Sequence, residues 1–430
     1  MILSRVIFTV ILIISISFFS YNLWKIVRNI RLGKSKNRFD NPLKRLKILF
    51  KIAFGQTKLF ARPASGILHA LVYWGFLVIT IGTLEMMIDG VFGLERSFGV
   101  LGNFYNIAIA SGEIMAILVL LSCLLFMIRR IFLNIKRFSG KEMKTSSSID
   151  AIIALIIISL LMISLLTMNI GYIGIHSNDY VGFYPVSEIL LPFFSNFNLH
   201  VFHDISWWAH ILLVLIFLNE LPYSKHFHVV MSIPNVYFSN IKNLGEINNM
   251  SSVTKEVKLM MDPNIDPYSE NESTNEVNST FGAKDVTDLN WVQLMNSYSC
   301  TECGRCTSEC PANQTGKLLS PRKIMMDTRN RLKEVGKNID KYGQDYKDGK
   351  SLLNDYITKE ELWACTTCNA CTQACPLNID PLSIIIDLRR QLVMEESAAP
   401  QELNMMFNNI ENNGAPWQFS QNDRLNWKDE

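Results

Sequence analysis

The sequence predicts an all-α protein in which a bundle of five membrane-spanning helices is followed by a helical domain built around two cysteine runs. Hydrophobic residues make up 49% of the 430 residues, and five apolar stretches in the N-terminal half are long enough to cross a bilayer. Eight of the nine cysteines lie in two short runs nearer the C-terminus. No alternation of apolar and polar residues surrounds those runs, which favours helices over strands. The net charge of +2 gives no indication of nucleic-acid binding.

The apolar stretches define the predicted membrane helices. The first is expected to stay as an anchor, because its serines lead to no small-residue cleavage site and a basic segment follows directly. The five helices are expected near Val6–Trp24, Ile67–Ile88, Ile107–Ile128, Ala151–Tyr172 and Ile205–Leu221.

Lysine and arginine are unevenly distributed between the loops. The segment Lys25–Arg62 carries twelve of them with one acid, Asp40, and positions 129–144 carry six, whereas Thr145–Ser224 carries none. Because cytoplasmic loops are enriched in Lys and Arg, we expect a multi-pass protein of the cytoplasmic (inner) membrane with its N-terminus outside. Five spans then place the C-terminal half in the cytoplasm. The basic loops are expected to be solvated or to bind anionic lipid headgroups.

The two cysteine runs share the spacing C-x2-C-x2-C-x3-C-P, which is the bacterial pattern for a pair of 4Fe–4S clusters. Three closely spaced thiolates hold three corners of one cluster, and the fourth cysteine, before proline, ligates the other. Structural zinc is the alternative, but its four-ligand sites leave no use for a third cysteine two residues on. We therefore assign one cluster to Cys300, Cys303, Cys306 and Cys375, and the other to Cys365, Cys368, Cys371 and Cys310.

The remaining sequence outside the membrane helices divides by composition. Two proline-started helices, from Pro321 and from Pro381, follow the two runs and indicate an internal duplication. Cys123, in an apolar stretch, is interpreted as a buried inert thiol. The expected domains are a transmembrane domain of five helices at 1–232, a linker at 233–289, a dicluster domain at 290–397 and a polar tail at 398–430.

Histidines indicate a haem in the membrane half, since neutral imidazoles on two helices can ligate a b-type haem from both sides. All seven histidines lie between positions 69 and 228. His69 is expected near the cytoplasmic end of the second span, at the depth of His228. His210 lies eighteen residues before His228, which in a continuous helix is the same face roughly 27 Å away. We predict an inner haem held by His69 and His228, with His226 pointing away.

A second haem is a separate hypothesis. It would use His210 with His203 or another outer histidine, because Ile79 stands where the second span would need a ligand. The alternative for His210 is a hydrogen bond to a quinone carbonyl. Gly75 and Gly82 are interpreted as helix-packing positions.

Two resemblances follow from these motifs. The membrane half resembles the gamma (cytochrome b) subunit of respiratory nitrate reductase and its relatives in heterodisulfide reductase and sulfite-reduction complexes, through Pro222-Tyr-Ser-Lys-His-Phe-His228, His210 and His69. The soluble half is similar to the dicluster subunit of heterodisulfide reductase and to the iron–sulfur part of anaerobic glycerol-3-phosphate dehydrogenase, through both runs with Gly304-Arg305 and Pro311-Ala-Asn. As a whole, the chain resembles fused membrane cytochrome b and iron–sulfur subunits of heterodisulfide reductase-like complexes, including those linking electron-transfer flavoprotein to menaquinone.

This resemblance implies a membrane-bound electron-transfer subunit between a soluble partner, two 4Fe–4S clusters, b-type haem and menaquinone or another quinone. The family's catalytic subunit carries cysteine-rich C-C-G repeats, and no two adjacent cysteines occur in this sequence. We therefore expect no catalytic residue here and a C-C-G-repeat heterodisulfide reductase-like partner, with electron-transfer flavoprotein as a further candidate. The alternative is a membrane anchor and iron–sulfur subunit for a soluble enzyme, without quinone chemistry of its own.

Overall fold

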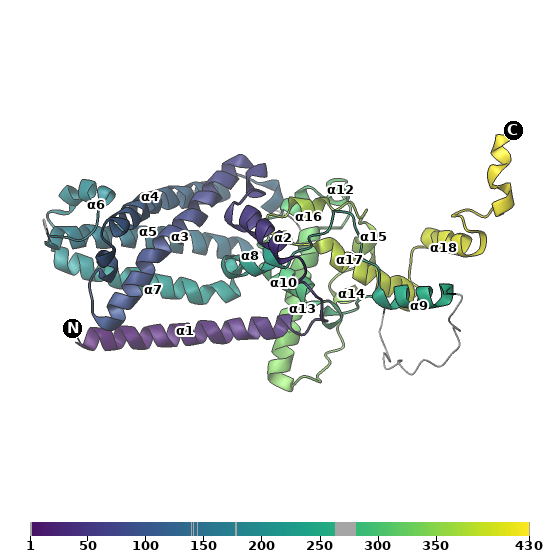
Figure 1. The fold of residues 1–430 in the computed structure, drawn as a ribbon, viewed down its shortest axis with the longest axis horizontal. Helices are drawn as coiled ribbons and strands as arrows, with labels where there is room; N and C mark the ends of the chain where they lie inside the picture. The colour runs from purple at the N-terminus through teal and green to yellow at the C-terminus, as the bar shows by residue number, and fades with distance from the viewer. Residues whose placement is uncertain are drawn as a thin grey trace.

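The chain is described here from a computed structural model covering residues 2–138, 140, 142–143, 145–176, 179–262 and 281–429. The molecule is elongated: a bundle of long helices lies at one end, the cysteine domain lies beside it, and the C-terminal segment projects at the other end (Figure 1). Over the described ranges the structure contains helices and two isolated β-bridges but no β-strand. The all-α prediction is confirmed for this part of the chain.

Within the described part of the chain, five helices are long and apolar enough to cross a membrane, and they contain the five predicted stretches. Much of their apolar surface is exposed, as expected for helices that face lipid. Helix α5 packs on α4 and α7, while α3 packs chiefly on α4, and α1 lies along both α3 and α7. The bounds are α1 (Ile2–Ile30), α3 (Pro63–Phe92), α4 (Asn103–Phe132), α5 (Thr145–His176) and α7 (Leu199–Glu220).

Short helices connect these spans or follow the last of them. They are α2 (Pro42–Leu49), η1 (Phe50–Phe54), η2 (Leu59–Ala61), η3 (Ser97–Leu101), η4 (Lys136–Phe138), α6 (Pro185–Leu190), η5 (Leu191–Phe194), η6 (Leu221–Tyr223), η7 (Lys225–Phe227) and α8 (His228–Tyr237).

The last membrane helix does not continue into the histidine motif. Helix α7 ends at Glu220, and Ser224 has extended backbone angles of φ −96° and ψ 159°. The Ser224 hydroxyl accepts a hydrogen bond from the His226 amide, which starts the short turn before α8. The continuous helix from His210 to His228 on which the depth argument was based is therefore wrong, because a proline and a serine cap interrupt it.

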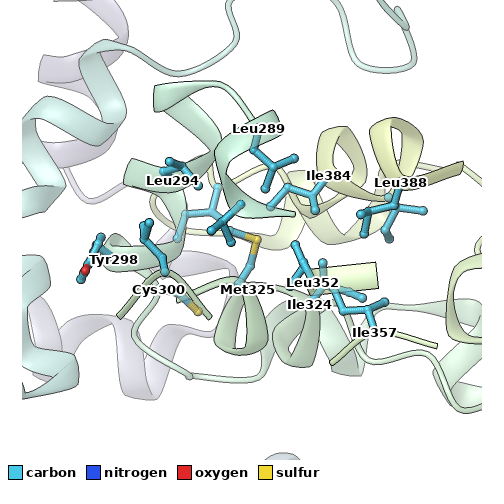
Figure 2. Packing of buried hydrophobic residues seen from close by; sticks show 14 of the residues in the cluster. Leu289, Leu294, Tyr298, Cys300, Ile324, Met325, Leu352, Ile357, Ile384 and Leu388 are labelled. Atoms are coloured by element: carbon cyan, nitrogen blue, oxygen red, sulfur yellow. The ribbon is translucent and has the colours of Figure 1, made fainter. Parts of the chain in front are cut away.

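The cysteine domain has one apolar core formed by residues from all its main helices (Figure 2). Leu294, Ile324, Ile384 and Leu388 are fully buried in it. Its elements are η8 (Val286–Asp288), α10 (Trp291–Ser299), α11 (Arg305–Ser308), α12 (Pro311–Gln314), α13 (Pro321–Tyr342), α14 (Leu352–Asp355), α15 (Lys359–Trp363), α16 (Ala370–Ala374), α17 (Pro381–Arg390) and η9 (Gln391–Glu395).

The predicted helices at Pro321 and Pro381 are confirmed as α13 and α17. Each begins with proline in its first turn, where a missing N–H costs nothing. The side chain before each proline caps the helix: Ser320 accepts from the Lys323 amide and Asp380 accepts from the Ser383 amide.

The segments flanking this domain differ partly from expectation. Ala283 and Val286, before the expected start at 290, lie in the same apolar cluster, which also includes Ile26 of α1 and Met231 of α8; the expected domain bounds stay a prediction. Within the expected linker, α9 (Ser251–Met261) is helical, while Asn264–Ser279 lies outside the described residues. The expected polar tail contains α18 (Gln401–Asn413) and η10 (Gln421–Lys428), both without a buried residue.

The basic segments pair with the cysteine domain, which the sequence interpretation did not anticipate. Lys25 bonds Asp340 at 3.0 Å at the end of α1, and Arg62 bonds Glu309 at 2.9 Å. Lys34 exchanges backbone hydrogen bonds with the chain around Asn290. These contacts fix the cysteine domain against one end of the helix bundle.

Candidate functional site

Four cysteines from both runs surround one cavity. The cavity is lined by Cys300, Cys303 and Cys306 of the first run and by Cys375 of the second. Cys300 caps α10, and Cys375 caps α16. Helices α11 and α16 pack together, which brings the fourth cysteine of the second run to the first three cysteines of the other.

The two loops that carry these cysteines have matching backbone conformations. Glu302 and Gly304 lie in the left-handed region in the first run, with φ of 57° and 70°, and Thr367 and Asn369 occupy the equivalent positions in the second, with φ of 57° and 61°. Three of the four are not glycine, so the curled loop conformation is held against its local preference. The duplication inferred from sequence therefore extends to the backbone of both loops.

The second set of cysteines also comes together. Burial raises the pKa of the Cys365 thiol, and the neighbouring Cys310 and Cys368 thiols add to that rise. The Thr367 amide donates to the Cys365 sulfur at 3.4 Å. Cys310 and Cys371 are buried, whereas Cys368 is exposed, so this set reaches the protein surface at Cys368.

The chemistry of these thiols fits metal ligation. Burial raises the pKa of Cys300 to about 11 and that of Cys375 to about 12. Thiolates so far from water need a cationic partner, which the iron of a bound cluster would supply. The cavity and its donors therefore fit a cluster.

Two histidines meet where the helix bundle reaches the cysteine domain. His69 on α3 and His228 at the start of α8 have ring centroids 6.3 Å apart, with the rings inclined at 39°. Metal–imidazole bonds are roughly 2 Å long, so one metal ion between two imidazoles separates their centroids by roughly 6 Å. The spacing fits a shared metal.

Hydrogen bonds leave the same nitrogen free on both rings. His69 Nδ1 lies 3.1 Å from Gln56 Oε1, and His228 Nδ1 lies 3.2 Å from the Lys225 carbonyl oxygen. Both oxygens are acceptors, so each Nδ1 carries the proton and each Nε2 is available to a metal. The Gln56 amide is oriented because its Nε2 donates to the Ala53 carbonyl at 3.1 Å.

Gln56 was missed by the sequence interpretation. It is buried and has a left-handed φ of 54°, in the turn that follows η1. A glutamine thirteen positions before a histidine carries no local signal, because a chain reversal rather than a helix brings them together.

His226 is close to the pair but bonded differently. Its ring centroid lies 6.2 Å from that of His228, yet its Nδ1 bonds the Ser224 hydroxyl at 2.7 Å. Burial lowers the pKa of His226 to about 3. The structure therefore gives His226 a local structural partner.

The structure does not bring His210 and His203 together as a pair. His210 is buried; its Nδ1 lies 3.1 Å from the Leu161 carbonyl oxygen and 3.0 Å from the Ser164 hydroxyl. His210 Nε2 has no hydrogen-bond partner among the described residues. His203 instead packs its backbone against Gly171 of α5. The second-haem hypothesis stays a prediction.

One segment joins the first cysteine site to the histidine pair. Lys58 Nζ donates to the Cys375 carbonyl at 3.2 Å. Arg305, between two cysteines of the first run, donates to the Lys58 and Leu59 carbonyls at 3.3 Å. Because Gln56 lies two residues before Lys58, the segment Gln56–Leu59 contacts both sites.

Comparisons with known proteins agree with this cysteine site. Residues 299–379 match the 4Fe–4S dicluster domain family. The chain is 28% identical to the probable iron–sulfur-binding oxidoreductase FadF of Bacillus subtilis, over 100% of this chain and 61% of the relative. It is 26% identical to an EtfAB:quinone oxidoreductase of Syntrophomonas wolfei, over 98% of this chain and 59% of the relative.

A further relative matches about a third of the chain. One of the subunits of a dihydromethanophenazine:CoB–CoM heterodisulfide reductase from Methanosarcina mazei is 31% identical over 33% of this chain and 35% of the relative. No solved structure matches the chain. The chain spans about three fifths of the length of the first two relatives. It thus carries a 4Fe–4S dicluster domain and is related to iron–sulfur oxidoreductases.

Proposed function

We propose that this chain is a membrane-bound electron-transfer subunit that passes electrons between a soluble partner, two 4Fe–4S clusters, a b-type haem held by His69 and His228, and a membrane quinone such as menaquinone. The observation that carries the proposal is the histidine pair at 6.3 Å, with both Nδ1 atoms bonded to carbonyl oxygens. Clusters and haem would supply one-electron transfer when bound. The chain's residues position these groups and exclude water.

The positions of the two cysteine sites and the histidine pair support an order in which electrons would pass them. The cysteine site of Cys300, Cys303, Cys306 and Cys375 is linked to the histidine pair through Gln56–Leu59. The other site includes the exposed Cys368. We infer that a soluble partner meets the second site, and that the first site stands between it and the haem.

The partner follows from the relatives' names. An EtfAB:quinone oxidoreductase among them favours electron-transfer flavoprotein and a quinone, and heterodisulfide reductase subunits favour a C-C-G-repeat catalytic protein. The resemblance of the membrane half to nitrate reductase gamma subunits belongs to this proposal too. It rests on the positions of His69, His210 and His228.

Membranes that contain the full chain provide the test. Dithionite and menadiol should each produce a reduced b-type haem spectrum, because the histidine pair would hold a haem that communicates with a quinol. Membranes without the chain serve as control. If the chain is instead an anchor without quinone chemistry, menadiol will reduce neither the haem nor the clusters. A protein that is fully loaded with clusters but lacks haem would contradict the proposal directly.

We also propose an inner-membrane location with the cysteine domain in the cytoplasm, on the distribution of Lys and Arg between the loops. After Leu221, a fused reporter that works only in the cytoplasm should be active, and one that works only outside the membrane should be inactive. At Gly182, between α5 and α6, the two reporters should give the opposite result. The opposite pattern would place the clusters outside and remove the basis for a cytoplasmic electron donor.

A further inference from the structure

Helices α3, α4 and α5 enclose a cavity in the half of the bundle that lies away from the cysteine domain. The space opens toward the bundle surface and is lined mainly by apolar side chains, together with five polar ones: Glu85, Arg96, Tyr105, Glu113 and Asn169. No residue of the cysteine sites or the His69–His228 pair borders it. The cavity is therefore not part of the proposed electron path between the clusters and the histidine pair.

Two glycines on neighbouring helices, Gly82 of α3 and Gly112 of α4, line this cavity. A Cβ on Gly75 of α3 would lie 2.4 Å from a methyl group of Val119 on α4, so the helices touch there. Gly82 follows Gly75 by seven residues on α3, and Gly112 precedes Val119 by seven residues on α4. Seven residues are about two helical turns, and the two helices run in opposite directions. Gly82 and Gly112 therefore lie at the same level of the bundle, two turns from the contact at Gly75. Neither has an atom within 4 Å of the position a Cβ would take.

The packing interpretation of these glycines is therefore half right. Gly75 is a close-packing position, as predicted. Gly82 is not, because it opens onto empty space that a side chain would fill. Since the helices are already in contact at Gly75, the slot arises from the missing side chains and not from a separation of the helices.

The polar end of the slot is a buried hydrogen-bonded group. Tyr105 donates its hydroxyl to Glu85 at 3.0 Å, and Glu85 is 1% exposed. Arg96 lies 3.8 Å from the same carboxylate and donates to Asn169 at 2.9 Å. All four side chains line the cavity. Intramembrane ionisable groups are costly, which makes them candidates for function.

The slot is accessible from the side that would face lipid. Ile81 lines the cavity and is 47% exposed on the bundle surface. A ligand could therefore enter from the bilayer with its apolar part last and reach the polar end with its oxygens. A lipid acyl chain has no hydrogen-bonding group for that polar end, whereas a ring that carries oxygens can accept hydrogen bonds there.

We propose that the Gly82–Gly112 slot binds the ring of a lipid-soluble quinone, with a ring oxygen at Tyr105 and Arg96; this inference rests on the proposed function. Conversion of quinone to quinol takes up two electrons and two protons. The electrons would come from the chain's redox centres. The hydroxyl of Tyr105, bonded to Glu85, lies where a proton can pass to or from a ring oxygen.

A photoreactive azido-naphthoquinone, applied to membranes with the full chain, tests the site. Cross-linked peptides should come from α3 and α4 and should disappear in competition with menadione. Gly82→Leu or Gly112→Leu should reduce cross-linking by roughly tenfold or more, since even one methylene in a binding pocket changes affinity by about tenfold. Leu84→Phe is the matched control, because Leu84 is exposed on α3 and does not line the slot.

The dithionite-reduced haem spectrum reports folding of every variant. If a glycine variant fails this control, Tyr105→Phe provides the test, with weaker cross-linking and an unchanged dithionite spectrum. Cross-links confined to other helices, with menadiol reduction of the haem intact, would overturn the slot but leave the proposed function standing. Cross-links in the slot without any menadiol reduction would do the reverse.

Discussion

His69→Ala should abolish the reduced-minus-oxidised haem spectrum of membranes that contain this chain, and His228→Ala should do the same. The two rings lie 6.3 Å apart, and both keep Nε2 free through hydrogen bonds at Nδ1. A haem held by these two imidazoles would lose one of its protein ligands, and with it its normal spectrum. Dithionite difference spectra at matched protein levels measure the effect, and menadiol reduction of the clusters should be lost as well.

His226→Ala is the matched control for this experiment. His226 is as near to His228 as His69 is, but its Nδ1 is bonded to Ser224. We expect most of the haem spectrum to remain. The cluster signals after dithionite should be normal in all three variants, which shows that the domain folds. A normal haem spectrum in His69→Ala would remove this pair as the haem site and leave His210 as the remaining candidate.

Gln56 gives the same hypothesis a graded test. Gln56→Leu removes the acceptor that orients His69, and loss of such a partner weakens metal binding by about 10–100-fold. Gln56→Glu keeps an acceptor and adds negative charge, which should strengthen donation by the ring and lower the haem midpoint potential. A redox titration of membranes separates these outcomes. Equal potentials in both variants and the parent protein would show that Gln56 does not act on the haem ligand.

The sequence alone predicted the features whose length or spacing along the chain has a direct physical cause. Bilayer thickness fixes the length of an apolar span, and the cluster geometry fixes the cysteine spacing, so both were found. The pairing of His69 and His228 was predicted by depth, although through a continuous helix that Ser224 interrupts. The expected depth of His228 was nevertheless correct, because the turn after α7 keeps this residue at the same end of the bundle as His69.

The features that sequence reasoning missed depend on register between distant segments. Charge alone showed that Lys25 and Arg62 are basic, but it could not show that Asp340 and Glu309 lie opposite. Gln56 meets His69 only through a chain reversal. From the sequence, Gly82 and Gly75 could not be told apart as helix-packing positions. Only the packing of α3 on α4 shows that Gly75 is in close contact and that Gly82 faces open space.

Cys310→Ala should remove the cluster of the second cysteine run although Cys310 belongs to the first. Cys310 is close enough to Cys365 to raise the pKa of its thiol, whereas Cys375 lines the cavity of the first run. Iron per chain should fall from roughly eight to roughly four, because one cluster of four irons is lost. Low-temperature EPR of the reduced protein should then show one cluster without the interaction signal of a pair.

Two further variants identify which cluster remains. Cys375→Ala should leave the opposite cluster, so its EPR spectrum should differ from that of Cys310→Ala. Cys123→Ala should keep both clusters, since Cys123 is buried among the membrane helices, outside the cysteine sites. If each run held its own cluster, Cys310→Ala and Cys375→Ala would exchange their spectra. Because the first site adjoins the histidine pair, Cys375→Ala should also block menadiol reduction of the surviving cluster, and Cys310→Ala should not.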